Sequence, residues 1–416
     1  MQYTETAQAI LLLTCYFNKS EVKSVRPLTP LQYARLAAWL HHNKYSPASL
    51  LSDADSVLAQ WQDPKPGGKR NEITIERLQQ LLARGGSMAF ALEHWAKQGV
   101  HAVTRSCANY PQKIREKLGE TRPPVFFTVG NLELLNKPGI GFVGSREIDA
   151  DDESFTQNKA QLAVAQDFVV VSGGAKGVDQ TSMLSALEQG GASIGVLADS
   201  LLRASASKAY RDGLRDNRLL LLSPFYPEAG FTPANAMARN KYIYALSEAV
   251  VVVKSALTGG TWTGANENLK HQWCPLWVRN NDHPGNQELI KLGALPMAED
   301  FACFNSPQPV ATQPELEPAT NDLFATPDTV ETPAEAPSTA TESTAETLDT
   351  NAPVTAATAP TGQPEKTVVR INPTEIFSQQ TQAAYIDTQA EVDAYLNALK
   401  DKLQAALDQH QRINIQ

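Results

Sequence analysis

The stretch FVVVSGGAKGVD, residues 168–179, decides the fold of this chain. It opens with an apolar run without polar alternation, which indicates a strand buried on both faces of a parallel sheet. Glycines and one lysine follow, and then a segment with helical spacing. Such a loop presents backbone N–H groups at the start of a helix, where they can hold an anion. It is not a nucleotide-binding Walker A loop, because the GxxxxGK[ST] spacing is absent.

The same order of strand, loop and helix recurs on both sides of this stretch. The other apolar runs are GIGFVGSRE (139–147), SIGVLADS (193–200), RLLLLSPFYP (218–227), EAVVVVKSA (248–256) and CPLWVRN (274–280). Strands separated by helix-sized segments are typical of α/β proteins. We therefore expect residues 121–304 to form a Rossmann-like, doubly wound and mostly parallel sheet.

The residues before this domain have a different pattern. In residues 1–120, apolar side chains recur with helical spacing, which predicts an N-terminal helical domain. The apolar run Ala9–Phe17 lacks the preceding basic residues and the cleavage pattern of a signal peptide, so we expect a buried helix there. No apolar stretch approaches the roughly 20 residues that cross a bilayer. The four cysteines form no CxxC pair. We therefore expect a soluble, cytoplasmic protein with reduced thiols.

The residues after the α/β domain change composition again. Residues 305–367 are rich in Pro, Ala, Thr and Glu, which predicts a disordered linker. Residues 368–416 regain helical spacing and predict a C-terminal helical segment. That segment has three open roles: docking on its own chain, self-association, or binding a partner protein. Residues 305–365 hold ten acidic residues and no basic one, so the formal charge of −9 becomes about +1 without them. Net charge therefore neither favours nor excludes nucleic acid.

Polar and cationic residues follow the predicted strands. Because open α/β sheets bind ligands at the carboxyl ends of their strands, we expect these loops to form one cationic rim for a phosphodiester backbone or a nucleotide. Asp179 is expected to cap the helix that it opens rather than to bind a metal. The candidate nucleic-acid-binding residues are Gly144, Ser145, Arg146, Ser172, Gly173, Lys176, Arg239, Asn240, Lys241, Gly260 and Thr261.

Signs of catalysis are missing from the sequence. No nucleophile with a general base, no metal-ligand cluster and no pair of acid and base carboxylates stands out among the motifs. We therefore expect no catalytic residue, no metal and no cofactor.

The motifs resemble the DprA/Smf family of DNA-processing proteins over residues 110–296. They match in order at Tyr110-Pro111, Pro123-Pro124, Gly130-Asn131, Val143–Arg146, Ser172–Asp179, Arg239–Lys241 with Leu246-Ser247, Gly259–Ala265 and Gly285-Asn286. The resemblance implies a Rossmann-like domain that binds single-stranded DNA in a positive pocket and forms a homodimer. It also implies a non-enzymatic role in DNA uptake and recombination, in which the strand passes to a RecA-type recombinase.

The sequence also departs from the family pattern. Thr181-Ser182 stands where the family has Ala-His, Lys254 stands where it has an acidic residue, and Tyr210 lacks the proline that usually follows it. The acidic stretch from residue 305 stands where family members commonly carry a winged helix. These departures leave the biological role open between DNA uptake, recombination and defence.

Two other functions fit parts of the sequence. The stretch GGTWTGANE, ending at Glu267, resembles the PGGxGTxxE signature of the Lonely-guy nucleotide phosphoribohydrolases. In that chemistry a carboxylate helps to cleave an N-glycosidic bond. The second alternative is a sensor, in which a small nucleotide occupies the pocket and the tethered C-terminal helix recruits a partner in defence against mobile DNA.

Overall fold

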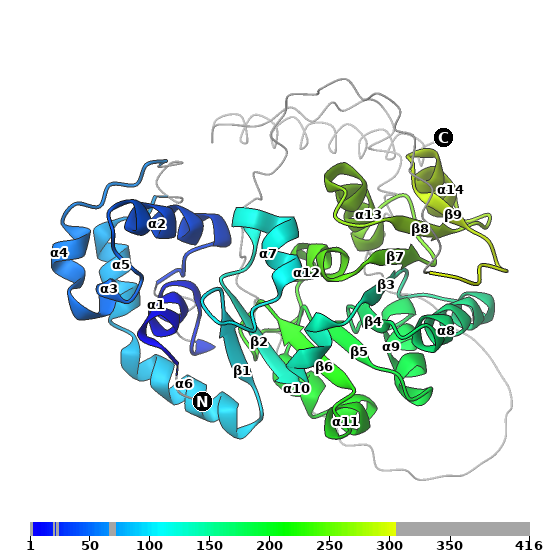
Figure 1. The fold of residues 1–416 in the computed structure, drawn as a ribbon, viewed down its shortest axis with the longest axis horizontal. Coiled ribbons are helices and arrows are strands. Elements are labelled where there is room, and N and C mark those ends of the chain that lie inside the picture. Colours follow the sequence, from blue (N-terminus) through cyan, green and yellow to red (C-terminus); the bar gives the residue numbers. More distant parts are fainter. Residues whose placement is uncertain (1–2, 20, 22–24, 66–71, 305–416) are drawn as a thin grey trace, which may run out of the picture. The chain divides into compact units, whose positions relative to one another are not determined.

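The computed structural model describes residues 3–19, 21, 25–65 and 72–304, which Figure 1 shows as a coloured ribbon. All of them lie in one compact unit, Met1–Asp322. The expected linker, 305–367, and the expected C-terminal helical segment, 368–416, lie outside the described residues.

The chain begins with helices, as expected. The buried run at Ala9–Phe17 falls largely in α1, whose N-cap Thr4 accepts a hydrogen bond from the Ala7 N–H. The second helix begins with a capping box between Thr29 and Gln32. The helices are α1 (Glu5–Thr14), α2 (Pro30–His42), α3 (Ser49–Ser52), α4 (Ala54–Leu58), α5 (Ile75–Leu82) and α6 (Gly85–Lys97). None of the helices in the described part of the chain is long and apolar enough to span a bilayer.

The helical part ends earlier than residue 120. After α6 the chain forms β1 (His101–Thr104), which pairs antiparallel with β2 (Val125–Gly130). Between them, α7 (Gln112–Leu118) and the 3₁₀ turn η2 (Gly119–Thr121) already belong to the α/β part. An edge strand of four residues lacks the long apolar run that marks the central strands, so its sequence carries no local strand signal.

The described strands form one sheet of nine strands in the order β1-β2-β6-β5-β4-β3-β7-β8-β9. All neighbours from β6 to β9 are parallel, whereas β2 pairs antiparallel with β1 and with β6. The predicted doubly wound, mostly parallel sheet is therefore confirmed. The remaining strands are β3 (Gly139–Val143), β4 (Val169–Ser172), β5 (Ser193–Val196), β6 (Leu219–Ser223), β7 (Ala249–Val252), β8 (Leu276–Arg279) and β9 (Leu295–Met297).

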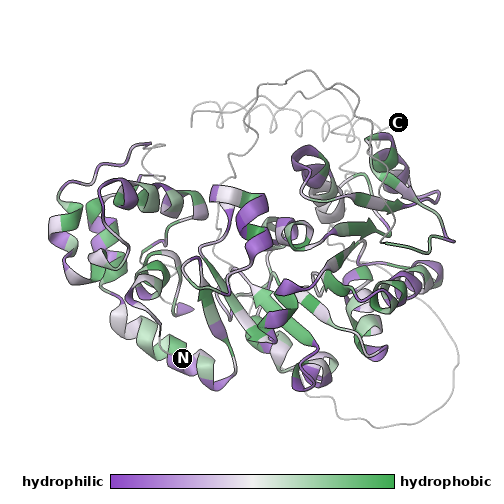
Figure 2. Cartoon of the chain, in the orientation of Figure 1, coloured by the Kyte–Doolittle hydropathy of each residue, from purple (hydrophilic) through white to green (hydrophobic). Residues whose placement is uncertain are grey.

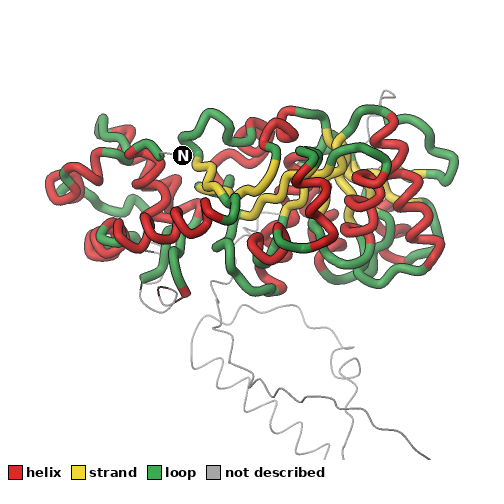
Figure 3. The backbone as a smooth tube through the Cα atoms, turned by 90° about the horizontal axis from the view of Figure 1, so that it is seen from below, coloured by secondary structure: helices red, strands yellow, loops and turns green. Residues whose placement is uncertain are grey.

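Helices cover both faces of the sheet (Figure 3). Alternate residues of β6 serve the two faces: Leu219 and Leu221 pack with α8 and α9, whereas Leu220 and Leu222 pack with α7, α12 and α13. This double burial explains why the strands are apolar throughout and appear as hydrophobic ribbons in Figure 2. The helices are α8 (Ala150–Ala165), α9 (Val178–Glu188), α10 (Leu201–Ser205), α11 (Lys208–Arg215), α12 (Pro233–Leu246), α13 (Gly260–His271) and α14 (Pro284–Lys291). The 3₁₀ turn η3 (Leu132–Asn136) joins β2 to β3.

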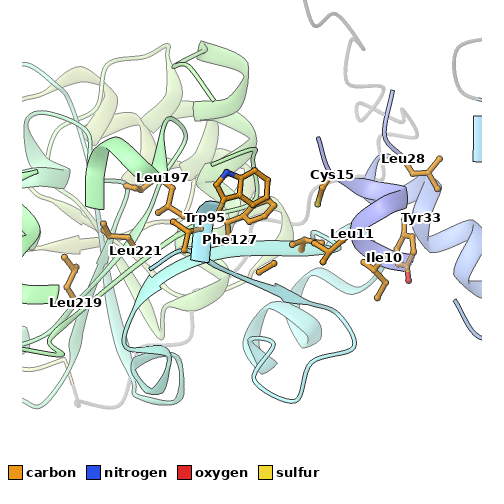
Figure 4. Packing of buried hydrophobic residues seen from close by; sticks show 14 of the residues in the cluster. Ile10, Leu11, Cys15, Leu28, Tyr33, Trp95, Phe127, Leu197, Leu219 and Leu221 are labelled. Atoms are coloured by element: carbon orange, nitrogen blue, oxygen red, sulfur yellow. The ribbon is translucent and has the colours of Figure 1, made fainter. Parts of the chain in front are cut away.

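The N-terminal helices share a hydrophobic core with the sheet (Figure 4). Trp95 of α6 is almost fully buried, and its ring meets Phe127 of β2 edge to face at a centroid distance of 5.2 Å. Tyr226, which follows β6, meets the same indole at 5.8 Å. The helical part is therefore packed against the sheet through aromatic contacts.

Candidate functional site

A pocket of about 270 Å³ lies at the carboxyl ends of the central strands. Three of its walls are the loops that follow β3, β4 and β5, and the fourth comes from Arg239 in α12 and from Phe231 in the loop before that helix. Open α/β sheets bind ligands at this edge. The lining residues are Arg146, Gly173, Gly174, Ala175, Lys176, Ala198, Asp199, Phe231 and Arg239.

Close backbone packing holds the first two loops together. The Val178 N–H donates to the Ser145 carbonyl over 3.3 Å. Gly177 has a positive φ of 86°, and a Cβ there would lie 2.4 Å from the Ser145 oxygen. A Cβ on Gly144 would lie 2.4 Å from Val178. Only glycines allow this approach, so the two loops form a rigid turn under the pocket.

Ser145 and Ser172 support this turn. The Ser145 hydroxyl accepts from the Glu147 N–H over 3.0 Å, and the Ser145 N–H donates to the Lys254 carbonyl over 3.0 Å. Ser172 has no exposed surface, and its hydroxyl donates to the Phe142 carbonyl over 2.6 Å. The Ser172 side chain therefore joins β4 to β3 and does not reach the pocket surface.

Arg239 forms the inner wall of the pocket. Its side chain is buried, and Nη1 donates to the Val196 carbonyl. The Nε atom is buried without a hydrogen-bond partner among the described residues. Burial lowers the pKa of Arg239, and the negative charges of Asp179 and Asp199 oppose that effect. An arginine held this way keeps donor capacity for a ligand in the pocket.

Asp179 does not cap its helix, so that expectation was wrong. The N-cap of α9 is Gly177, and no side chain caps this end. Asp179 instead lies in the first turn, where its buried carboxylate accepts from the Ala175 N–H and faces Arg239. Burial raises the pKa of Asp179, and the Arg239 charge opposes that rise. The helix starts two residues earlier than a cap at Asp179 would need, because the glycine turn packs onto Ser145.

Arg146 and Lys176 are exposed cations at the pocket mouth. The guanidinium of Arg146 stacks on the ring of Phe231 at 4.6 Å. Phe231 itself is 48% exposed, which is unusual for a phenylalanine and leaves much of its ring available to a ligand. The motif reading missed Phe231. Its sequence signal was an aromatic residue directly before Thr232, which caps the helix that carries Arg239.

Seven of the eleven candidate residues lie outside the pocket lining: Gly144, Ser145 and Ser172, described above, and four residues of α12 and α13. Arg239 and Lys241 are two residues apart on α12, which turns their side chains about 200° from one another. Lys241 therefore faces Glu267 of α13, whose negative charge opposes the lowering of the Lys241 pKa by burial. The Asn240 amide donates to the Gly260 carbonyl over 3.0 Å and ties α12 to α13. Gly260 and Thr261 begin α13 beside this contact.

The positions of the acidic, histidine and cysteine side chains test two chemical possibilities, a metal site and the carboxylate of a phosphoribohydrolase. Within the described ranges, no three His, Cys, Asp or Glu side chains gather where they could hold a metal ion. Glu267, the carboxylate on which the phosphoribohydrolase alternative depends, lies with Lys241 and not among the residues that line the pocket.

The doubly wound sheet and the cationic pocket at its carboxyl edge define a Rossmann-like protein. Residues 101–305 match the DNA recombination-mediator protein A family, and this part of the chain belongs to the DprA/Smf family as a divergent member. The match covers the region over which the motifs resemble that family. Separately, residues 370–416 match the BrxC C-terminal alpha-beta domain family.

Curated relatives agree with this assignment, and a solved structure shares the fold. The chain is 30% identical over 141 residues to the DNA processing protein DprA of Streptococcus pneumoniae and 28% identical over 182 residues to that of Bacillus subtilis. These matches cover 33% and 43% of this chain and 49% and 60% of the relatives. The X-ray structure of the Streptococcus pneumoniae DprA superimposes with a TM-score of 0.53 at 20% identity, covering 71% of this chain and 95% of that one. The solved structure supports the fold.

Proposed function

We propose that the DprA/Smf-type domain binds single-stranded DNA in the pocket around Arg239 and acts in DNA processing and recombination. One observation carries the proposal: Arg146, Lys176 and Arg239 come from three different elements and meet around one pocket that also presents the ring of Phe231. The relatives that match this domain are named DNA processing proteins.

The composition of the pocket favours a strand over a simple anion. Cationic groups neutralise phosphates and make binding depend on salt. An exposed aromatic ring adds a surface on which a base can stack, and stacking is available only when bases are unpaired. A pocket of about 270 Å³ between loops suits a nucleotide of a single strand rather than a duplex. Asp199 in the lining limits the positive charge and disfavours indiscriminate binding of anions.

The proposal extends to features that the resemblance implies. We expect the chain to act without catalysing a reaction, to form a homodimer, to lie in the cytoplasm and to pass its strand to a RecA-type recombinase. The position of Glu267 beside Lys241, outside the pocket lining, favours a binding role over a phosphoribohydrolase.

Binding of a labelled, unstructured oligonucleotide to the full chain at several salt concentrations tests this function. The slope of log K against log salt should fall by about 0.7 in Arg146→Gln, the value for one phosphate contact to a single strand. Arg215→Gln is a matched control, because Arg215 is exposed and lies on α11 just before β6 begins, at the opposite edge of the sheet. Absence of salt-dependent binding by the parent protein would refute the proposal.

A second role is favoured by the match of residues 370–416 to the BrxC C-terminal alpha-beta domain. A segment shared with another family, outside the DprA/Smf-type domain, suits a recruiting element that acts beside strand binding. Deleting residues 305–416 should then leave oligonucleotide affinity unchanged and abolish capture of a partner protein. Loss of oligonucleotide affinity in this deletion would contradict the separation of the two roles.

A further inference from the structure

Two arginines outside the pocket lie together without an acidic partner. Arg105 follows β1 and Arg122 precedes β2, and both side chains are partly buried. No carboxylate lies within ion-pair distance of either guanidinium among the described residues, although other partly buried arginines, such as Arg84 with Glu21, have one. Burial lowers the pKa of Arg105 to about 10, and the charge of Arg122 contributes to that shift. Partly buried charges are normally paired, so this cluster lacks an anion.

The hydrogen bonds of the two side chains leave donors unused. Arg105 Nη2 donates to the carbonyls of Glu120, over 2.9 Å, and of Arg122. Arg122 Nη1 donates to the Gly119 carbonyl. The Nε atoms of both arginines are buried and have no partner in the described part of the chain. The carbonyls of η2 therefore position the guanidinium groups but do not saturate them or neutralise their charge.

An aromatic residue of the helical part fixes the orientation of this cluster. The ring of Tyr33 on α2 lies under the Arg105 guanidinium at 5.5 Å from its centroid. Tyr33 is buried, so the ring has little freedom to move. The N-terminal helices thus help to build a cationic group that belongs to the α/β part.

The arginine pair lies at the same edge of the sheet as the pocket. Strand β2 is antiparallel to β6, and Phe127 pairs with Ser223, the last residue of β6. The chain therefore enters β2, three residues after Arg122, at the edge where the parallel strands end. Strands β6 and β5 lie between β2 and β4. At the usual strand spacing, β2 beside the arginine pair is therefore about 14 Å from β4, whose loop lines the pocket.

Helix α12 links the two places. Arg239 of the pocket and Tyr242 are three residues apart on α12, about 4.5 Å along the axis and on neighbouring positions of one face. The ring of Tyr242 meets Phe126 of β2 at 5.4 Å, and Tyr242 is near enough to Arg105 to influence the pKa of that arginine. A strand that leaves the pocket along this edge reaches the arginine pair within a few nucleotides.

We propose that Arg105 and Arg122 form a second phosphate-binding subsite for the strand held in the Arg239 pocket. The planar guanidinium groups match the oxygens of a phosphodiester, and the bound phosphate supplies the anion that the cluster lacks. This inference rests on the proposed strand binding. It adds a prediction about length: a short oligonucleotide fills the pocket alone, whereas a longer one occupies both places.

Chemical protection on the unmodified full chain tests the subsite. The protein is treated with phenylglyoxal, which modifies accessible arginines, either alone or with an unstructured oligonucleotide of about 4 or about 16 nucleotides, the range of common single-strand sites. Peptide mass spectrometry then reports Arg105, Arg122 and Arg146 separately. We expect both oligonucleotides to protect Arg146 and only the longer one to protect Arg105 and Arg122. Protection of Arg146 without protection of the pair overturns the subsite alone, and no protection of Arg146 overturns the proposed function.

Charge removal provides the second test. In Arg105→Gln/Arg122→Gln the amides can still donate to the η2 carbonyls, and thermal melting checks the fold. With the longer oligonucleotide the salt slope should fall by about 1.4, two phosphate contacts, and with the shorter one it should stay as in the parent. Arg215→Gln controls for the general loss of positive charge. An unchanged slope with the longer oligonucleotide in a folded variant refutes the subsite, and the protection experiment decides the case if the variant does not fold.

Discussion

A side chain at residue 173 would occupy the space that the Arg239 guanidinium fills. A Cβ built on Gly173 lies 1.9 Å from Nη1 of Arg239 and 2.4 Å from the Asp179 carboxylate. The missing side chain thus lets Asp179 of α9 and Arg239 of α12 meet beside the loop after β4. The glycine is required here by close approach, since its φ is not in the left-handed region.

Gly173→Ala should therefore displace Arg239 and weaken strand binding. We expect the affinity for an unstructured oligonucleotide to fall at least about tenfold, corresponding to 1.4 kcal/mol, the scale of one hydrogen bond to a charged group. Fluorescence anisotropy measures it. Gly86→Ala is the control, because a Cβ there meets nothing within 4 Å. Equal affinity of Gly173→Ala and the parent would show that Arg239 does not contact the strand.

Lys241→Gln should leave strand binding almost unchanged, although the motif reading placed Lys241 among the contacts. Its ammonium faces Glu267 on the side of α12 away from Arg239. We expect the salt slope of oligonucleotide binding to equal that of the parent, in contrast to the drop of about 0.7 in Arg146→Gln. Equal drops in the two variants would mean that the strand also crosses the α12–α13 side.

Phe231→Ala should remove a stacking surface at the pocket mouth. Stacking of one base on an aromatic ring contributes roughly 1–3 kcal/mol, so affinity should fall by about five- to more than a hundredfold. Phe231→Trp should retain binding. Phe90→Ala on α6 is the control, since Phe90 is 77% exposed and far along the chain from the pocket. If an abasic oligonucleotide loses as much affinity in Phe231→Ala as a normal one, the ring does not stack on a base.

Trp95→Ala should destabilise the helical part and the sheet together. The indole is 1% exposed and contacts Phe127 and Tyr226, so its removal leaves a large cavity between α6 and the sheet. Truncations of this kind cost about 3–5 kcal/mol, measurable by urea unfolding. Phe90→Ala on the same helix should change stability by less than about 0.5 kcal/mol. Two separate unfolding transitions in the parent would contradict the shared core.

Lys254→Gln should lower stability at neutral pH. Lys254 Nζ lies 2.6 Å from the buried carboxylate of Asp152 and 3.4 Å from Asp149. The hydrogen bond to Asp152 raises the pKa of Lys254. A raised lysine pKa means that the stabilisation is present at neutral pH and is lost as pH rises through the folded-state pKa, above the ordinary value of 10.5.

Urea unfolding of the parent and of Lys254→Gln checks this sign. The difference between their free energies of unfolding should be positive near neutral pH and should shrink above about pH 10.5. Lys97→Gln is the control, because its ion pair with Glu93 is exposed and contributes little. A difference that is independent of pH would show that Lys254 stabilises by packing alone.

Much of the fold could be predicted because its signals are local. The apolar runs at β3 to β8 indicate double burial without knowledge of their neighbours, and the glycine loop at residues 173–177 indicates a close turn before a helix. The edge strands were not predicted. β1 has four residues, and its pairing with β2 across 20 intervening residues leaves no local pattern.

The candidate site was predicted less completely. The loops at the carboxyl ends of the strands were expected to meet, and the pocket is lined by four of the candidate residues: Arg146, Gly173, Lys176 and Arg239. Asp199 and Phe231 went unnoticed because neither stands in a glycine-rich motif. Lys241 was grouped with Arg239 from its place in the chain, but side-chain direction on a helix depends on the angle between positions.

The sequence by itself determined the class of fold, the loops that follow the central strands and the family resemblance, because each depends on residues that are close in the chain. Tertiary structure alone decided which side of α12 faces the pocket, that Asp179 meets Arg239 across Gly173, and that Arg105 and Arg122 stand together without an acid. Those relationships join segments far apart in sequence, and only packing around the sheet sets the distances between their charges.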